Sequence, residues 1–371
     1  MQDFDVHVLG GGIVGRCLAL SLARAGMRVA LASQPVRAAD APDVRAYALN
    51  AASVGLLQRL KVWDALPAPS VTAVLDMQVH GDQARAELDF SAWQQHVSAL
   101  AWIVDAAVLE RELAGAVRFA PHVTVVETGA AVSAPLTALC EGKASTTRQA
   151  LGVRFERHAY GHQAIAARLT STRAHQGVAR QWFRAPDVLA LLPMDAPMAG
   201  RTLALVWSMP DERADAAMAL EPDAFVEQLA QATGTDVGEL TLASPRAAWP
   251  LMLAQATAWC GPGWVLLGDA AHVVHPLAGQ GLNLGLADVL ALVQVLGERE
   301  SWRDLGDEKL LRRYARERLA KTWAMGQVTD GLLRLFAQPS PVVRELRNRG
   351  LTLVNQLSPV KRWLAARALD S

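Results

Sequence analysis

The chain has 371 residues, 51% of them hydrophobic, and 36 Lys plus Arg balance 36 Asp plus Glu for a formal net charge of zero. This length is enough for a large core and for two lobes around a cleft, while the neutral charge gives no general attraction for nucleic acid, which is not expected as a partner. The three cysteines, Cys17, Cys140 and Cys260, lack CxxC spacing, which argues against a disulfide framework or a cysteine metal site and favours small buried apolar side chains in a reducing cytosol.

The N-terminal segment is expected to form a strand, a turn, a helix and a second strand. Residues 5–9 are a short apolar run, 13–25 carry apolar residues at helical spacing, and 28–32 form the second run. Gly26 stands where such a helix stops. Arginines and three consecutive glycines interrupt the apolar residues, which argues against a membrane span or a signal peptide.

The turn of this unit carries the glycine spacing of a dinucleotide site. Gly10 permits the tight turn, Gly12 lets the backbone approach a pyrophosphate, and Gly15 lets the helix pack on the strand. Ile13 and Val14 begin the helix, whose free N–H groups and partial positive charge would face the phosphates. The alternative is a glycine-rich turn without a ligand.

An acid that binds ribose hydroxyls is expected where the second strand ends. The sequence has Ser33 and then Gln34 at this place. These side chains can form hydrogen bonds with a ribose, but they lack the strength of a carboxylate. A looser grip on the adenosine half is therefore expected.

The middle of the chain is expected to supply a mostly β lobe. Residues 70–98 and 160–250 belong to it because the sequence after 168 alternates apolar and polar side chains. Within this stretch, 211–240 reads as helical with a break at Glu221-Pro222. Between the two parts of this lobe, 115–140 leaves room for about one strand and a fragment.

A second signature begins near residue 264. A strand over 264–267 leads into Gly268 and Asp269, then a loop and a long apolar helix over about 281–296. Asp269 can accept hydrogen bonds from sugar-like hydroxyls, while loop N–H groups and the helix N-terminus suit a flat anionic ligand. The other candidate contacts of this loop are Pro276, Gly279, Gly281, Leu282 and Asn283.

Three motifs resemble those of the FAD-dependent aromatic hydroxylases, the group A flavin monooxygenases. "GDAAHVVHPLAGQGLNLGLADV" matches the Gly-Asp motif of the ubiquinone-biosynthesis hydroxylases, "GDAAHxxHPxAGQGxNLGxxDV". "DVRAYALNAASVGLLQRLKVWDAL" is similar to their Arg-x-x-Ala-Leu segment, in which the arginine, here Arg45, approaches the flavin. "EGKASTTR" is similar to their Asp-Gly-x-x-Ser-x-x-Arg motif, with Glu141 in place of Asp.

The resemblance covers most of the chain and implies a mixed α/β fold like that of the p-hydroxybenzoate hydroxylase-like flavoproteins. It implies a discontinuous Rossmann-like FAD-binding domain (1–69, 99–159 and 251–338), a β-rich substrate domain (70–98 and 160–250) and a C-terminal helical segment (339–371). The implied FAD contacts are Gly10, Gly12, Ile13, Val14, Gly15, Ser33, Arg45, Glu141, Gly268, Asp269, Pro276, Gly279, Gly281, Leu282 and Asn283.

No catalytic residue and no metal site is assigned. His272 and His275 have a spacing possible for a metal, but no acidic or Cys partner stands nearby except Asp269. His275 is either an active-site base or, the favoured interpretation, a structural residue that holds the loop.

The chemistry implied by the resemblance is hydroxylation of an aromatic ring. NAD(P)H would reduce FAD, O2 would give a C4a-hydroperoxyflavin, and a polyprenyl phenol of ubiquinone biosynthesis would accept the oxygen. The alternatives are a hydroxylase for a small soluble aromatic, with a polar pocket, and a degenerate non-catalytic paralogue that scaffolds a biosynthetic complex. Ser33, Glu141 and the short 115–140 region favour the paralogue; the intact Gly-Asp motif argues against it.

A cytoplasmic protein is expected, with a basic C-terminal segment that begins at Pro339. Arginines and lysines alternate there with Leu, Val and Trp363. The segment is either an amphipathic helical pair packed on the body or a basic face that meets a partner subunit or the inner membrane face.

Overall fold

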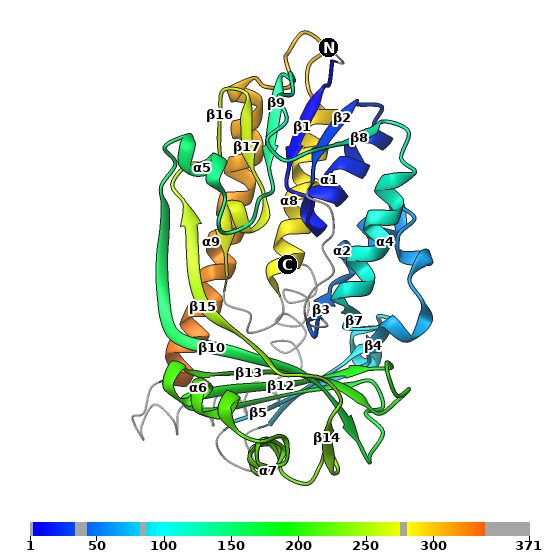
Figure 1. Ribbon diagram of the computed structural model, residues 1–371, viewed down its shortest axis with the longest axis vertical. Coiled ribbons are helices and arrows are strands. Elements are labelled where there is room, and N and C mark those ends of the chain that lie inside the picture. The colour runs from blue at the N-terminus through cyan, green and yellow to red at the C-terminus, as the bar shows by residue number, and fades with distance from the viewer. Residues whose placement is uncertain (1–2, 34–42, 82–86, 275–279, 338–371) are drawn as a thin grey trace.

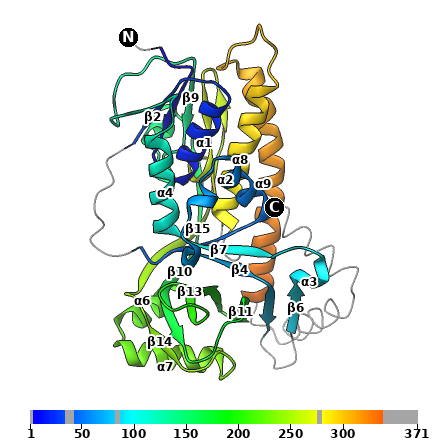
Figure 2. The same ribbon diagram turned by 90° about the vertical axis from the view of Figure 1, so that its right-hand side faces the viewer.

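A computed structural model describes residues 3–33, 43–81, 87–274 and 280–337, which form two lobes (Figure 1). A six-stranded sheet with its helices occupies the upper part of Figure 1, and a nine-stranded sheet crosses the lower part. A three-stranded sheet lies between them, as both views show (Figure 2). No helix among these described residues is both long and apolar enough to cross a membrane.

The first sheet has the order β16-β17-β9-β1-β2-β8 and is parallel except for the β16–β17 hairpin. Its strands are β1 (Val6–Leu9), β2 (Val29–Ala32), β8 (Val123–Val126), β9 (Leu136–Leu139), β16 (Cys260–Gly261) and β17 (Trp264–Leu266). Helix α1 packs on β1 and β2 and contacts both α4 and α8. The helices of this lobe are α1 (Ile13–Arg24), α4 (Ala106–Arg118), α8 (Gln280–Gly297) and α9 (Glu308–Ala337).

The predicted strand, turn, helix and strand at the N-terminus are confirmed. Helix α1 ends at Arg24, and Gly26 follows with φ +84°. The N–H of Met27 then donates to the carbonyl of Leu22 at 3.1 Å, which satisfies an otherwise free helix carbonyl. Cys17, on the buried side of this helix, is fully buried in the core, as expected, whereas Cys140 and Cys260 are half-buried against the same core.

The nine-stranded sheet has the order β18-β15-β10-β13-β12-β11-β5-β6, with β14 paired to β10. On β13, Leu203, Leu205 and Trp207 belong to the core that includes residues of α6 and α7, while Ala204 and Val206 alternate with them. This alternation gives the sheet one face covered by helices and one face turned to the other lobe. The strands are β5 (Asp76–His80), β6 (Glu87–Ser91), β10 (Phe155–Ser171), β11 (Val178–Arg184), β12 (Asp187–Met194), β13 (Thr202–Pro210), β14 (Leu240–Leu242), β15 (Ala247–Ala256) and β18 (His272–Val273).

Shorter elements connect the two lobes. The antiparallel strands of the middle sheet have the order β3-β7-β4, and both β4 and β7 contact β12 of the larger sheet. The strands of this middle sheet are β3 (Ala46–Leu49), β4 (Val71–Val74) and β7 (Ala101–Asp105). The remaining short helices are α2 (Ala51–Arg59), α3 (Ala92–Gln95), α5 (Thr146–Ala150), η1 (Trp63–Ala65), η2 (Ala68–Ser70) and η3 (Gly268–Ala270).

Two expectations for the middle of the chain have different outcomes. The helical stretch with a break is confirmed as α6 (Asp211–Ala219) and α7 (Pro222–Thr233). The expectation of one strand and a fragment over 115–140 is wrong, because α4 ends at Arg118 and two full strands, β8 and β9, follow. Four residues suffice for each strand. Parallel neighbours on both sides bury β9, and β8 pairs with β2.

The expected domain borders cut through two long strands. β10 and β15 pair along most of their length and run from the lower sheet up towards α5, so residues on both sides of positions 159 and 250 share one ladder (Figure 1). The borders therefore stay a prediction. The expected C-terminal segment, 339–371, lies outside the described residues.

Candidate active site

A cavity of about 660 Å³ lies between the two lobes. One wall follows the carboxyl ends of β1, β9 and β17, where parallel strands end at the same edge of the first sheet. Such an edge is where open α/β sheets bind ligands. The residues that follow these strands and line the cavity include Gly12, Ile13, Val14, Cys140, Lys143 and Asp269.

The opposite wall is the free face of the nine-stranded sheet. Its side chains are mostly small and apolar, since the register aligns Ala190 on β12, Val206 on β13 and Ala166 on β10 in one row. Arg180, Gln181 and Ser208 add one charged and two polar groups to this wall. Short side chains leave space for a large apolar ligand above the sheet.

The three glycines of the N-terminal turn differ in what surrounds them. A Cβ atom at Gly10 would collide with the carbonyl oxygen of Cys140, and one at Gly15 would collide with the carbonyl oxygen of Gly10. A Cβ atom at Gly12 would meet no protein atom within 4 Å. Gly10 and Gly15 thus allow close backbone packing, whereas Gly12 opens the N-terminus of α1 to the cavity.

Ser33 lies beside this turn. Its N–H donates to the carbonyl of Val126 at 3.2 Å, and its hydroxyl occupies the space that a side chain at Gly11 would need. Ser33 stands outside the cavity lining, at the end of β2 where an acid was expected. Its contact with a ribose stays a prediction, and Gln34 falls outside the described part of the chain.

The Gly268-Asp269 turn brings a carboxyl group to the cavity. Gly268 has φ +57° and packs against Val14, while Asp269 lines the cavity and is accessible to solvent from it. Desolvation by the surrounding protein raises the pKa of Asp269, and the charges of His272, Lys143 and Arg45 oppose that rise. An accessible carboxylate with positive neighbours suits the acceptance of hydroxyl hydrogen bonds.

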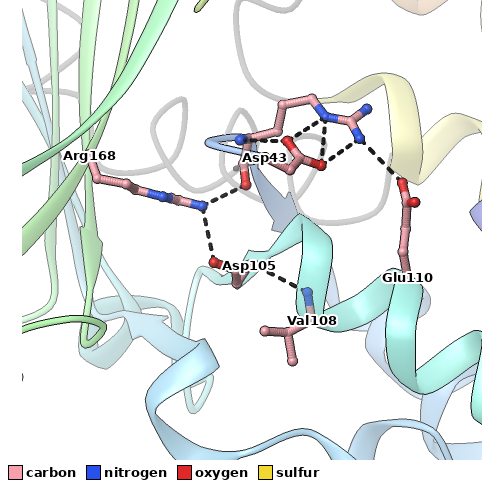
Figure 3. Close-up of polar contacts among 6 residues, drawn as sticks. Asp43, Asp105, Val108, Glu110 and Arg168 are labelled. Atoms are coloured by element: carbon pink, nitrogen blue, oxygen red, sulfur yellow. Dashed lines mark hydrogen bonds and ion pairs between the residues drawn. The ribbon is translucent and has the colours of Figure 1, made fainter. Parts of the chain in front are cut away.

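Arg45 lines the cavity at the start of β3 and is held by two carboxylates (Figure 3). Its Nε and Nη2 donate to Asp43 at 2.9 Å and 2.6 Å, and Nη2 lies 3.3 Å from Glu110. The Asp43 hydrogen bond is the main cause that raises the pKa of Arg45. The guanidinium is therefore charged and oriented before any ligand arrives.

The backbone of Arg45 is fixed from the other lobe. Arg168 on β10 donates from Nη2 to the carbonyl of Arg45 at 2.6 Å and lies 3.3 Å from Asp105, the N-cap of α4 (Figure 3). The first N–H of α4, from Ala106, donates to the same carbonyl at 3.2 Å. Arg168 is nearly fully buried and also contacts the sulfur of Met194.

The side chains of two predicted contacts are engaged elsewhere. Glu141 accepts hydrogen bonds from Ser145 at 2.6 Å and Thr147 at 3.0 Å, so it organises the start of α5 and stands outside the cavity lining. Asn283 is buried; its Oδ1 accepts from the N–H of Asn50 at 3.1 Å and from the hydroxyl of Ser53 at 2.8 Å. Their contacts with a cofactor stay predictions.

The structure thus brings one subset of the predicted contacts together around the cavity: Gly12, Ile13, Val14, Arg45, Asp269, Gly281 and Leu282. Those that support it from outside the lining are Gly10, Gly15, Ser33, Glu141, Gly268 and Asn283. Those outside the described residues are Pro276 and Gly279, and His275, weighed as a base or a structural residue, lies outside them too.

A family model described as an FAD binding domain matches residues 3–119 and 109–329 of this chain. The chain belongs to the FAD-binding-domain family. FAD is accordingly the dinucleotide for which the cavity is built.

Named relatives agree with this assignment, and a solved structure has the same fold. The chain is 29% identical over 392 residues to 3-demethoxyubiquinol 3-hydroxylase of Escherichia coli, with 99% of each chain covered. It is 28% identical over 390 residues to ubiquinone hydroxylase UbiL of Rhodospirillum rubrum, covering 99% of this chain and 90% of that protein. A structure of pqsL, a probable FAD-dependent monooxygenase from Pseudomonas aeruginosa, matches with a TM-score of 0.78 at 20% identity over 94% of this chain and 99% of that one, which confirms the predicted α/β fold.

The residues present fit FAD. The open space at Gly12 admits a pyrophosphate to the α1 N-terminus, whose first turn contains no acidic side chain. Arg45 adds a charged donor, and Asp269 adds an acceptor for hydroxyl groups. Phosphate-binding and hydroxyl-binding groups thus lie along one side of the cavity.

A buried charge cluster that was not predicted from the sequence fixes the Gly268–Asp269 turn. Asp288 on α8 accepts hydrogen bonds from Gly268 N–H at 2.9 Å, His272 Nε2 at 2.7 Å and Arg318 Nε at 2.7 Å. Burial alone would raise the pKa of Asp288, but His272 and Arg318 hold it below its ordinary value. His272 and Asp288 both stand in the Gly-Asp motif quoted above, whereas Arg318 lies outside the quoted motifs.

The cluster also gives His272 a structural role. His272 is buried and stacks on Trp259 with 5.0 Å between ring centroids, while its Nε2 faces Asp288. In the described part of the chain no group of three His, Cys, Asp or Glu side chains could hold a metal ion.

Arg148 of the "EGKASTTR" motif supports the same turn from the other side. It is fully buried, donates to the carbonyl of Ala270 at 2.7 Å and lies over the ring of Phe155 at 3.8 Å. The motif therefore braces the Gly268–Ala270 turn through its arginine.

Proposed function

We propose that this protein is an FAD-dependent monooxygenase that hydroxylates the ring of a polyprenyl phenol of ubiquinone biosynthesis, with NAD(P)H as reductant and O2 as oxidant. The observation that carries the proposal is the single cavity that joins FAD-binding groups on one wall to an apolar sheet face on the other. Two relatives named as hydroxylases of ubiquinone and demethoxyubiquinol, each aligned over 99% of this chain, support the substrate class.

The FAD-binding wall performs the binding and orientation. The N–H groups at the start of α1 and the guanidinium of Arg45 bind the pyrophosphate, and Asp269 accepts hydrogen bonds from hydroxyl groups of the cofactor. Asp288 and Arg148 hold the turn that carries Asp269. When bound, FAD supplies the redox chemistry that activates O2 for transfer of one oxygen atom.

The sheet wall selects and shields the substrate. Ala166, Ala190 and Val206 give it an apolar surface with little side-chain bulk, which suits an aromatic ring with an apolar chain and excludes water from the reaction. A small soluble aromatic with charged substituents would call for more charged groups on this wall. Because a polyprenyl chain partitions into lipid, the proposal includes a peripheral contact with the inner membrane face.

The experiment that tests the proposal compares two phenols. The purified full chain is saturated with FAD, its visible absorption is recorded, and NAD(P)H oxidation is followed with a long-chain prenylated phenol and with a phenol that lacks the chain. The proposal expects substrate-stimulated oxidation with the prenylated phenol and a product that contains one additional oxygen atom.

Two results would contradict the proposal in different ways. Turnover of the short, charged phenol alone would support the hydroxylase of a small soluble aromatic. A protein that retains no FAD would favour the non-catalytic paralogue.

A further inference from the structure

Glu110 places a negative charge at the FAD-binding end of the cavity. It lies on α4, lines the cavity, and has a side chain that is 38% exposed. Its Oε1 lies 3.3 Å from Nη2 of Arg45, and its main-chain carbonyl accepts from Arg16 at 3.1 Å. The helix and the Arg16 contact thus hold Glu110 beside the guanidinium of Arg45, which lines the cavity.

Arg45 is shared unequally between its two carboxylates. Asp43 binds it through Nε and Nη2, and the shortest distance is 2.6 Å, so Asp43 fixes the guanidinium plane. Glu110 makes the longer contact to Nη2 alone. Among the described residues no acceptor contacts Nη1. The donors available to a cavity ligand are therefore Nη1 and the Nη2 hydrogen directed at Glu110.

The positive side chains at this end of the cavity do not outnumber the negative ones. Arg45 and Lys143 are opposed by Glu110 and Asp269, which line the same space, and by Asp43 behind Arg45. The FAD pyrophosphate brings two further negative charges. Opposite charges within about 4–6 Å attract and like charges repel at this range, so a pyrophosphate bound beside Arg45 would compete with Glu110 for its guanidinium.

Building on the proposed FAD-dependent function, we infer that Glu110 is an affinity-setting residue that weakens FAD binding by competing with the cofactor pyrophosphate for Arg45. Loss of the Glu110 charge frees Nη2 of Arg45, while Asp43 still orients the guanidinium. Because both side chains are partly exposed, solvent screens the effect, and it corresponds to about a three- to fivefold change in Kd.

The test titrates FAD into the flavin-free full chain and follows the flavin fluorescence. Glu110→Gln is compared with wild type and with Glu112→Gln, which removes the same charge from the same helix at a residue outside the cavity lining, paired with Arg111 at 3.0 Å. Glu110→Gln is expected to lower the Kd for FAD about three- to fivefold, and Glu112→Gln is expected to leave it unchanged. The gain is expected to shrink as ionic strength rises.

A double-mutant cycle with Arg45 tests the route of the effect. In an Arg45→Met background the gain from Glu110→Gln is expected to disappear; Arg45→Lys, which keeps a charge without the planar fork, serves as the second background. An unchanged or higher Kd for Glu110→Gln, or a gain that persists without Arg45, would overturn the inference while the FAD-dependent function stands. If no variant binds FAD, the inference and the proposed function both fail.

Discussion

Replacement of Asp288 by asparagine is expected to destabilise the protein more than any exposed substitution. The change keeps the side-chain shape but leaves Arg318 and His272 buried without their carboxylate, since Asp288 accepts from both at 2.7 Å. Breaking a buried ion pair by the loss of one partner costs about 3–5 kcal/mol. The lost contacts are those that join Asp288 to Arg318 on α9 and to His272 on β18, after the Gly268–Asp269 turn.

The pH dependence of this loss has a defined sign. The pKa of Asp288 is held below its ordinary value, so its stabilising contribution is present above the pKa of the unfolded chain, about 3.9. That contribution is lost as the pH falls through the folded value. The difference in unfolding free energy between wild type and Asp288→Asn is therefore expected to be full at pH 7 and to shrink below about pH 4.

The assay is urea denaturation of both proteins, followed by circular dichroism at several pH values. Asp223→Asn is the control, because Asp223 is exposed in the first turn of α7 and its loss is expected to cost less than about 0.5 kcal/mol. A loss for Asp288→Asn no larger than that of Asp223→Asn at pH 7 would refute the role of the cluster.

Three further predictions concern the cavity. Gly12→Ala is expected to leave the melting temperature unchanged and to raise the Kd for FAD about tenfold. Gly15→Ala is expected to cost about 1–3 kcal/mol of stability, because its Cβ atom would collide with the backbone. Thermal melts and FAD titrations separate the two variants, and an equal fall in melting temperature would contradict the reasoning. Ala166→Trp, on the sheet wall, is expected to lower the turnover of a prenylated phenol about tenfold or more while FAD is retained. The control, Ala159→Trp on the exposed part of β10, is expected to have no effect on turnover. Unchanged turnover in Ala166→Trp would show that this wall is not part of the substrate site. Burial, partly opposed by Arg45, raises the pKa of Tyr47 to about 12, so the difference in ultraviolet absorbance between wild type and Tyr47→Phe should show no tyrosinate signal at pH 10, and a signal there would place Tyr47 in water.

Local sequence patterns were sufficient to predict the parts of the FAD-binding wall. Gly12 and Asp269 lie in short motifs whose residues are also neighbours in the fold, and both line the cavity as the motifs predict. The same applies to the break between α6 and α7, which a proline determines.

Contacts between residues that are far apart in the sequence were not predicted. Arg168 meets the carbonyl of Arg45 from 123 positions away, and Arg318 meets Asp288 from another helix. Nothing in the local periodicity of β10 or α9 distinguishes these arginines from surface charges. The cap contacts of Glu141 with Ser145 and Thr147 were also not predicted, although these partners are near it in the sequence, and its contact with the cofactor stays a prediction.

The most direct test of the central claim uses isotopically labelled O2. The FAD-saturated protein is mixed with NAD(P)H and a prenylated phenol under labelled O2, and the product is analysed by mass spectrometry. The account predicts a ring-hydroxylated product that carries one labelled oxygen atom. NAD(P)H oxidation that yields only hydrogen peroxide, or an unaltered phenol, would contradict it.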